Sequence, residues 1–406
     1  MTHLTDKDLQ DQTLLLSRGC EALYTQPELM ARLKSAAAAG RQLRIKYGMD
    51  PTAPDIHLGH TVQLRTIRRF QDLGHRAVLI IGDYTARVGD PSGANKTRPI
   101  LTPEQIELNA ATYMQQAGKV LDTSSDKLEI RRNSEWLGQW TFADILNVAS
   151  QMTVARMMER DTFEIRYKAN APIGLHEFLY PLMQGYDSIC VQADVEMGGS
   201  DQTFNCLVGR QFQENAGQPP QIVLITPILV GLDGVMKMSK SKGNYIGITE
   251  CPRDMFGKVM SIPDAMMDNY FTLLTDLPRA QIAELIDPAR THPRQAKATL
   301  GRMIVAQYHG AAAGEAASEE FDRIFAAKGK PDQMPEIAVA SAEMNIVELV
   351  CQAGFAASKG EARRLVGQNA VSLDDRKITS IEESVKLAGG MVLQVGKRRF
   401  GKIVVK

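Results

Sequence analysis

The sequence predicts an α/β fold with a parallel sheet, followed by an all-helical region and a small α+β module. Three observations predict it. An apolar run at 43–48, an amphipathic segment at 58–73 and an unbroken apolar run at 77–82 indicate strand, helix and strand, which implies a right-handed unit with parallel strands. Residues 252–327 indicate helices punctuated by prolines, and residues 344–406 indicate two helices and three short strands. A chain of 406 residues has room for two to three domains.

The other elements are justified in chain order. A helix at 28–39 ends at Gly40. Thr102-Pro103-Glu104-Gln105 begins a helix with a capping box and a proline at its first position. The remaining expected elements are a strand at 127–131, helices at 142–160 and 176–187, a strand at 193–197, a double-glycine turn at 198–199, a helix capped by Ser200 or Asp201, and a strand at 222–225.

Composition excludes several classes of protein. No apolar run approaches the roughly 20 residues of a membrane helix, and the polar N-terminus is no signal peptide, so we expect a cytoplasmic protein. Five scattered cysteines without a Cys-x-x-Cys argue against a disulfide framework and a zinc site. Net charge is zero, but residues 344–406 hold 11 basic and 6 acidic residues. That basic tail is a candidate surface for a polyanion.

The turn from Asp50 to His60 follows the first strand and opens the first helix of the strand–helix–strand unit. His57 and His60 are three residues apart, so both imidazoles lie on one side of the first turn, beside unpaired N–H groups and the positive end of the helix dipole. A phosphate fits there. Taken alone, the pair could also be two polar histidines satisfied locally.

A second motif is the Gly-bounded loop 234–244, which carries Lys237, Lys240 and Lys242 after an apolar strand. Alone, such a lysine cluster is usually a solvated surface. On the expected helix at 176–187, Tyr180, Gln184 and Asp187 share one face, which suits either a pocket wall for a polar ligand or an ordinary amphipathic surface.

Together these stretches resemble the bacterial tyrosyl-tRNA synthetases of the class I aminoacyl-tRNA synthetase family, over nearly the whole chain. The two signature motifs are His57-Leu58-Gly59-His60 and Lys237-Met238-Ser239-Lys240-Ser241. The tyrosine branch is indicated by Asp50-Pro51-Thr52-Ala53, Gly89-Asp90-Pro91-Ser92-Gly93, Tyr180-x-x-x-Gln184-x-x-Asp187 and Gly198-Gly199-Ser200-Asp201-Gln202.

The resemblance implies a domain organisation. Residues 1–246 would be a Rossmann-type, doubly wound catalytic domain with a dimer-forming insertion at about 100–190. A helical anticodon-side domain at 247–327, a linker at 328–343 and an S4-like RNA-binding domain at 344–406 would follow.

The resemblance also implies residue roles. Residues expected to bind ATP are Asp50, Thr52, His57, Gly59, His60, Gly199, Asp201, Lys237, Met238, Ser239 and Lys240. Residues expected to bind tyrosine are Gly48, Thr85, Asp90, Tyr180, Gln184, Asp187 and Gln202. His57, His60, Lys237 and Lys240, and with them Arg98, would stabilise the charge that develops on pyrophosphate. We expect no dedicated metal site, because Mg²⁺ would accompany the phosphates of ATP.

The implied reaction is activation of L-tyrosine by ATP to tyrosyl-adenylate and pyrophosphate, then transfer to the 3′-terminal adenosine of tRNA(Tyr) by a homodimer. Rival interpretations are a tryptophan enzyme, another nucleotidyltransferase of the superfamily and a non-catalytic RNA-binding paralogue. One position departs from the family: Lys46 stands where many members have a tyrosine that binds the phenol. We expect its stem to run toward solvent or a carboxylate, and the period of the strand to turn Tyr47 to the other side.

Overall fold

The computed structural model describes residues 5–24, 26–51, 55–91, 102–325, 334–396 and 399–405. The chain divides into two compact units, residues 1–309 and 310–406. The sheet predicted from the sequence lies in the first unit, and so does most of the helical region after residue 247.

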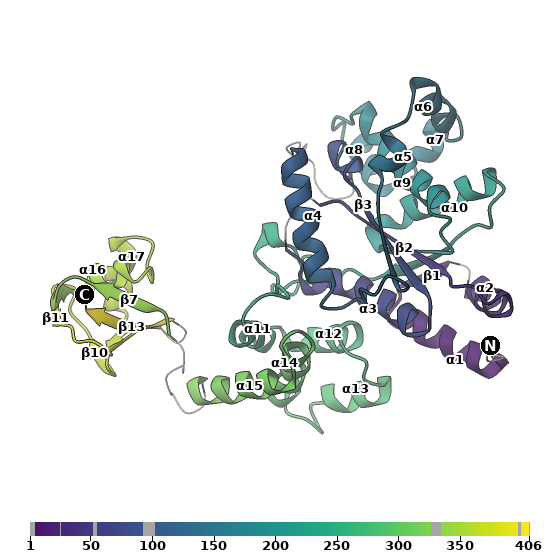
Figure 1. Ribbon diagram of the computed structural model, residues 1–406. Helices are drawn as coiled ribbons and strands as arrows, with labels where there is room; N and C mark the ends of the chain where they lie inside the picture. Colours follow the sequence, from purple (N-terminus) through teal and green to yellow (C-terminus); the bar gives the residue numbers. More distant parts are fainter. Residues whose placement is uncertain are drawn as a thin grey trace. The chain divides into compact units, whose positions relative to one another are not determined.

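The first unit is built on a six-stranded sheet (Figure 1) with the order β1-β6-β5-β2-β3-β4. Its strands are β1 (Ala22–Tyr24), β2 (Arg44–Met49), β3 (Arg76–Ile81), β4 (Leu128–Arg132), β5 (Val195–Gly199) and β6 (Ile222–Thr226). Strands β2 to β6 are parallel, and only the short β1, which the sequence did not reveal, is antiparallel to its neighbour β6. The α/β prediction is confirmed.

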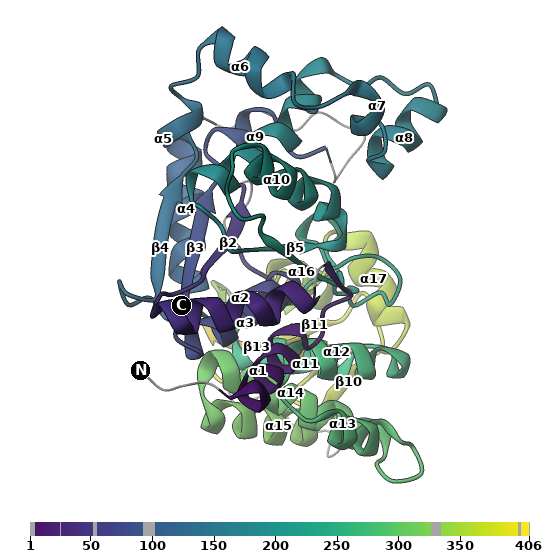
Figure 2. The same cartoon turned by 90° about the vertical axis from the view of Figure 1, so that its right-hand side faces the viewer.

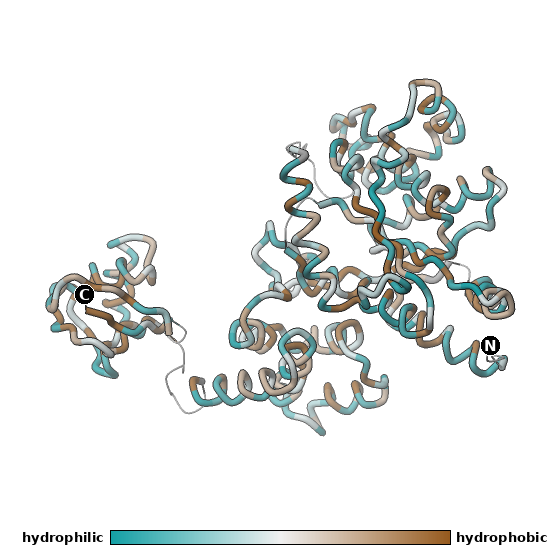
Figure 3. Tube along the Cα trace, viewed as in Figure 1, coloured by the Kyte–Doolittle hydropathy of each residue, from teal (hydrophilic) through white to brown (hydrophobic). Residues whose placement is uncertain are grey.

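The sheet is covered on both faces, which explains why β3 and β6 are nearly continuous apolar runs rather than alternating ones. Every residue of β5 and β6 is buried, and the central strands are marked as hydrophobic in Figure 3. Helix α4 (Pro103–Ala117) lies on one face and α10 (Thr203–Asn215) on the other, as Figures 1 and 2 both show. This is the doubly wound arrangement that the sequence predicted.

Strand β2 is where the chain changes direction across the sheet. It pairs with β3 on one side and with β5 on the other, and it leads into α3 (Leu58–Asp72). In open α/β sheets, ligands bind beyond the carboxyl ends of the strands at such a switch point. The Asp50–His60 turn lies at this position.

Between β4 and β5 the chain forms short helices at one end of the sheet (Figure 1). These are α5 (Ser134–Leu137), α6 (Phe142–Ala149), α7 (Val154–Met157) and α8 (Asp161–Lys168). The helical, interrupted character predicted for 142–160 is confirmed: the chain leaves α6 after Ala149, and Thr153 caps α7 with its side chain. The predicted 176–187 helix begins as a 3₁₀ turn, Leu175–Phe178, and continues as α9 (Leu179–Cys190).

Helices also precede and follow the sheet in the first unit. They are α1 (Asp6–Ser17), α2 (Gln26–Ala39), α11 (Pro252–Met260), α12 (Met267–Leu274), α13 (Arg279–Ile286) and α14 (Pro293–His309). Helix α2 matches the predicted first helix, and α1 was not predicted. Helix α12 contacts α3, so the helical region packs against the helix that begins in the Asp50–His60 turn, called the histidine turn below.

The second unit contains α15 (Ala311–Phe325) and a small α+β module. The module has α16 (Ile346–Gln352), α17 (Lys359–Gly367) and the strands β7 (Glu336–Val339), β8 (Glu343–Asn345), β9 (Val371–Leu373), β10 (Arg376–Ile378), β11 (Ser384–Lys386), β12 (Val392–Val395) and β13 (Arg399–Val405). The two helices and three strands predicted here are confirmed. A linker reaching residue 343 is wrong, because β7 pairs in parallel with β13 and buries Ile337 and Val339 in the module core.

Two absences apply to the part of the chain that the structure describes. No helix there is long and apolar enough to cross a membrane. No group of three or more His, Cys, Asp or Glu side chains in the same residues is arranged to hold a metal ion.

Candidate active site

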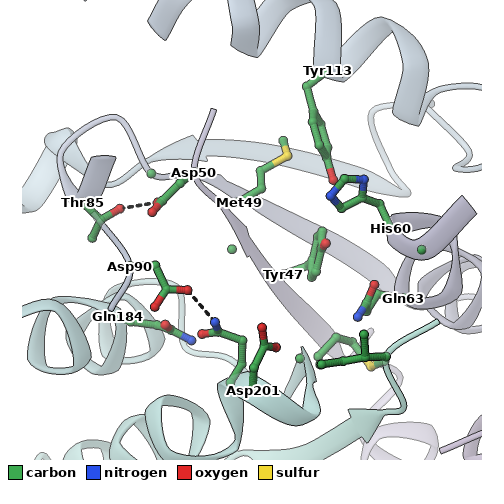
Figure 4. A pocket seen from close by; sticks show the side chains of 18 of the residues that line it. Tyr47, Met49, Asp50, His60, Gln63, Thr85, Asp90, Tyr113, Gln184 and Asp201 are labelled. Atoms are coloured by element: carbon green, nitrogen blue, oxygen red, sulfur yellow. Dashed lines mark hydrogen bonds between the residues drawn. The ribbon is translucent and has the colours of Figure 1, made fainter. Parts of the chain in front are cut away.

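A cavity of about 640 Å³ lies beyond the carboxyl ends of the parallel strands. It brings together nearly every residue that the sequence singled out, and Figure 4 shows several of these side chains around it. The predicted residues that line it are Gly48, Asp50, His57, Gly59, His60, Thr85, Asp90, Tyr180, Gln184, Asp187, Gly199, Asp201, Gln202, Lys237, Met238, Ser239 and Lys240. Thr52 and Arg98 lie outside the described residues.

The histidine turn forms the start of α3 as expected. His57 is the N-cap residue, with extended backbone, and its Nδ1 accepts a hydrogen bond from the Gly59 N–H at 3.2 Å. Nδ1 of His60 accepts from the His57 N–H, also at 3.2 Å. The two rings are stacked with their centroids 3.9 Å apart.

Both imidazoles are neutral near pH 7. Burial lowers the pKa of His57 to about 3 and that of His60 to about 4, and the Lys237 ammonium contributes to both shifts. In each neutral ring Nδ1 is the acceptor for a backbone N–H, so the proton resides on Nε2. The histidines can therefore donate Nε2–H bonds to a phosphate, but they bring no charge to it.

The lysine loop supplies the charge. Residues that directly follow it in the chain bond to the Asp50–His60 turn and the start of α3: the Leu58 N–H donates to the Ile246 carbonyl at 2.9 Å, and the Ile248 N–H donates to the Ile56 carbonyl at 3.1 Å. Lys237 Nζ lies 3.2 Å from Asp201 Oδ2, and Lys240 pairs with Asp55. Both lysine side chains are nearly half exposed, so an arriving polyphosphate can compete for them at small cost.

Asp50 lines the cavity and is bonded to residues other than the lysines. Its Oδ1 accepts from Thr85 Oγ1 at 2.8 Å (Figure 4), and its Oδ2 accepts from Tyr180 Oη at 2.9 Å. A Cβ on Gly82 would lie 2.0 Å from Asp50 Oδ1 and 2.4 Å from Thr85 Oγ1, so a glycine is required there. Asp50, assigned to ATP from the sequence, thus orients two residues assigned to tyrosine.

Asp90, Gln184 and Gln202, which line the cavity, are connected through the buried Asn205 and through one another. Gln202 Nε2 donates to Asp90 Oδ2 at 2.6 Å. Asn205 Nδ2 donates to Gln202 Oε1 at 3.0 Å and to Gln184 Oε1 at 2.9 Å. These bonds fix the amide oxygens and a carboxylate so that they can meet a small cation such as an amino group.

Asp187 on α9 forms a buried acceptor. Its Oδ1 accepts from Trp136 Nε1 at 2.8 Å, and its Oδ2 faces Asn133 Nδ2 at 3.5 Å. Burial raises the pKa of Asp187 to about 7, while Lys46 and these two hydrogen bonds oppose the rise. A carboxylate in this position can accept a hydroxyl proton from a ligand.

Lys46 does not behave as a surface lysine. Its side chain is fully buried and its Nζ lies 2.9 Å from Glu196 Oε1. The expectation of a carboxylate partner is confirmed, and the alternative of a solvent-directed stem is wrong. Tyr47, not Lys46, lines the cavity, because neighbouring residues of a strand face opposite ways.

Sequence reasoning missed several residues of the site. Asn133 lines the cavity and directly follows β4, at the edge where parallel strands present their ligands. Tyr113 lines it from α4, and the buried Arg160 donates to Asp90 Oδ1 at 3.1 Å. A polar residue directly after a predicted strand was the signal available for Asn133; no comparable signal marks Tyr113 or Arg160.

One predicted helix cap is also wrong. Ser200 and Asp201 belong to a 3₁₀ turn, Ser200–Gln202, and neither side chain caps α10. Asp201 is instead directed to Lys237, which agrees with a binding role more than with a capping role.

Comparison with known proteins gives the class that this fold and site define. Residues 38–326 match the family model for class I tRNA synthetases (W and Y). A solved tyrosyl-tRNA synthetase from Archaeoglobus fulgidus, complexed with L-tyrosine, superposes with a TM-score of 0.61 at 22% identity, covering 77% of this chain and all of that one. A mitochondrial tyrosyl-tRNA synthetase from Aspergillus nidulans gives 0.64 at 22% identity over 79% of this chain and 97% of that one. These two structures support the fold.

The tyrosine branch is decided by sequence relatives and by the second unit. Residues 326–401 match the model of the tyrosine–tRNA ligase SYY-like C-terminal domain. Tyrosine–tRNA ligases of Ralstonia nicotianae and Moorella thermoacetica are 52% and 47% identical, covering 96% and 98% of this chain and 98% and 97% of theirs. The chain belongs to the tyrosine–tRNA ligase family and is an aminoacyl-tRNA synthetase, so the tryptophan and non-catalytic interpretations are set aside.

Proposed function

We propose that this enzyme activates L-tyrosine with ATP to give tyrosyl-adenylate and pyrophosphate, and then transfers the tyrosyl group to the 3′-terminal adenosine of tRNA(Tyr). The observation that carries the proposal is that one cavity is lined both by groups that can bind a polyphosphate and by groups that can bind an amino acid. The residues that we assign to the phosphates and those that we assign to the amino acid line the same cavity.

The first step needs positioning and charge rather than a general base, because the tyrosine carboxylate is already a nucleophile. It attacks the α-phosphate, forms the acyl–phosphate bond, and expels pyrophosphate. Nε2–H of His57 and His60 and the ammonium groups of Lys237 and Lys240 would meet the charge that grows on the leaving group. Gly59, Gly199, Asp201, Met238 and Ser239 line the part of the cavity assigned to ATP. Mg²⁺ would accompany the phosphates, which supply most of its ligands.

Tyrosine would lie along α9. Asp90, Tyr180, Gln184 and Gln202 would bind the amino and carboxylate groups, with Thr85 and Gly48 alongside. Asp187 would accept the phenolic proton. The hydrogen-bonded set of Gln184, Asn205, Gln202 and Asp90 supports this assignment, because it gives the site fixed acceptors before the substrate arrives.

The test is exchange of labelled pyrophosphate into ATP that depends on the added amino acid. We expect exchange with tyrosine and much less with phenylalanine or tryptophan. A matched pair of variants is Asp90→Asn, in the cavity, and Asp83→Asn, a nearby carboxylate that bonds Ser134 and does not line the cavity. Only the first should raise the KM for tyrosine strongly. Pyrophosphate exchange that does not depend on added tyrosine would refute the assignment.

A homodimer is also proposed, formed through the insertion at about 100–190. Among the described residues, eight of the fifteen large apolar side chains that are exposed lie in this segment. They are Leu108, Ile130, Phe142, Leu146, Val154, Ile165, Tyr167 and Leu175. Such a concentration on one segment is typical of a surface that another protein covers.

Light scattering in solution tests the dimer. Phe142→Asp should convert the dimer to a monomer, whereas Ile381→Asp, an exposed apolar residue of the second unit, should not. A monomeric parent protein would refute the proposal.

Residues 344–406 are proposed to bind tRNA phosphates as an S4-like module. Their excess of basic over acidic residues supports contact with a polyanion. We also propose that the enzyme acts in the cytoplasm.

A further inference from the structure

Beneath the tyrosine part of the cavity lies a buried pair of opposite charges, Lys46 on β2 and Glu196 on β5. Lys46 is fully buried and Glu196 is 1% exposed. Neither lines the cavity in the described structure; the family motifs considered above give no role to Glu196, and Lys46 replaces a tyrosine that binds the phenol in many members. A buried ion pair seldom adds net stability compared with apolar residues, so its presence next to a binding site calls for another explanation.

We propose that Lys46 and Glu196 are a positioning pair for tyrosine: they hold the turn of α9 that carries Gln184 and Asp187 in the geometry that binds the substrate. This inference rests on the proposed function and assigns to it two residues outside the cavity.

The bonds of Lys46 carry the first part of the argument. Its three ammonium protons have three partners: the Gln184 carbonyl at 2.8 Å, Ser188 Oγ at 2.7 Å and Glu196 Oε1 at 2.9 Å. Two of these partners belong to α9, and Asp187 lies between them in the chain. One buried ammonium therefore holds the backbone before, and a side chain after, the residue that would bind the phenol.

Glu196 carries the second part. Its Oε1 also accepts from Gln184 Nε2 at 3.1 Å, which turns Gln184 Oε1 toward Asn205 at 2.9 Å. Asn205 continues to Gln202 and from there to Asp90. The charge pair thus connects through side chains to the groups proposed for the amino group and carboxylate of tyrosine.

The surroundings leave no room for the pair to move. Glu196 Oε2 accepts from Ser188 Oγ at 3.3 Å and also from Gln221. On the α10 side, a Cβ at Gly209 would lie only 2.6 Å from Ser188 Oγ and from Gln221 Nε2. Because every neighbour is in contact, a shift of the ammonium would be transmitted to α9.

The charge of Lys46 also acts on Asp187. Lys46 lowers the pKa of that carboxyl while burial and Glu196 raise it, with a result of about 7. The other groups around Asp187 are Trp136 and Asn133, which donate to it, and Tyr180 and Cys190, whose own pKa values it raises. Loss of the ammonium would favour the protonated carboxyl, which is a poorer acceptor for a phenol.

The experiment compares Lys46→Met with the double variant Lys46→Met/Glu196→Gln in the full-length enzyme. Tyrosine-dependent pyrophosphate exchange and urea unfolding are measured for each. Asp194→Asn is the control, because Asp194 is a buried carboxylate paired with Arg32 and Arg41 that does not line the cavity. Ser188→Ala is a milder variant that keeps the ion pair.

We expect Lys46→Met to raise the KM for tyrosine about 10- to 100-fold, as displacement of a binding group by about 1 Å does, with the KM for ATP changed by less than about twofold. In this variant, the acidic limb of the pH profile of kcat/KM for tyrosine should move to higher pH. The double variant should regain stability but not the KM for tyrosine. Ser188→Ala should raise that KM about threefold, and Asp194→Asn should change stability alone.

Several results would overturn the proposal. A normal KM for tyrosine in either Lys46 variant is one such result. If neither Lys46 variant folds, a normal KM for tyrosine in Ser188→Ala has the same meaning. Another is an equal rise in the KM values for tyrosine and ATP, which would mean that the pair is only structural. A parent enzyme without tyrosine-dependent exchange would instead refute the proposed function, so the two failures are distinguishable.

Discussion

Replacing Asp187 by asparagine should make the protein more stable and less selective at once. The pKa of this carboxyl rises from 3.8 to about 7, a shift of about three pH units, and at about 1.4 kcal/mol per unit its ionised form costs the fold about 4 kcal/mol. Asparagine removes that cost but bonds Trp136 Nε1 through a neutral oxygen, which loses about 1–2 kcal/mol. The net gain should be about 2 kcal/mol at pH 8.

The pH dependence has a defined sign. Because the pKa is raised in the folded state, the folded protein binds the proton between pH 4 and 7 while the unfolded chain does not. The cost of Asp187 is therefore complete above pH 7 and fades as the pH falls toward 4, so the advantage of Asp187→Asn should shrink over that range. The carboxylate Asp194, whose pKa is lowered by Arg41 against the effect of burial, should give the opposite result on conversion to asparagine.

Urea unfolding at pH 8 and pH 5, with exchange kinetics for tyrosine and phenylalanine, measures both effects. Loss of a charged acceptor for the phenol should lower kcat/KM for tyrosine by about 10- to 150-fold, equivalent to about 1.5–3 kcal/mol, and leave phenylalanine nearly unchanged. If Asp187→Asn is destabilised at pH 8, or keeps its preference for tyrosine, this account of the buried carboxylate is wrong.

Three further predictions concern the other parts of the molecule. Lys237→Ala and Lys240→Ala should each raise the barrier to adenylate formation by about 2–4 kcal/mol, as measured in single-turnover assays. The affinity for tyrosine should not change. An equal loss of rate and of tyrosine affinity would contradict a role confined to the reaction. His57→Ala removes the N-cap of α3 and should lower the free energy of unfolding in urea by about 1 kcal/mol. His57→Asn should restore the cap but not the rate of pyrophosphate exchange. If His57→Asn were as unstable as His57→Ala, the capping role would be contradicted. Ending the chain at Pro335, before β7, should leave pyrophosphate exchange intact and greatly weaken aminoacylation of tRNA. If the folded, shortened enzyme aminoacylated tRNA normally, the module would not be needed to bind tRNA.

The sequence predicted the parallel core because its signals are local. The apolar run of β3 and the capping box at Thr102 act within a few residues, and both appear where expected. The histidine turn was equally local, since a helix starting at Leu58 places His57 and His60 on one side by geometry alone.

What could not be predicted depends on partners far along the chain. The sequence left Lys46 directed toward either solvent or a carboxylate, because its partner Glu196 lies 150 residues later in the chain. β7 has only four residues, and its pairing with β13 has no sign in the local pattern, so its residues were assigned to a linker. The bond between Tyr180 and Asp50 could not be predicted for the same reason, because Tyr180 reaches Asp50 from α9, far along the chain.

The position of β1 has a consequence for how the protein forms. This three-residue strand pairs with β6, so that Ala22 lies opposite Ile225, and β2 gains its second neighbour, β5, only at Val195. Contacts this distant in sequence slow folding, because a long loop must close before the contact can form. A growing chain on the ribosome would expose the edge of β2 until about 150 further residues had emerged from the exit tunnel, and an unpaired parallel strand is prone to aggregate. Synthesis of this enzyme should therefore depend on chaperones that hold nascent chains, most strongly for intermediates that end before Thr226.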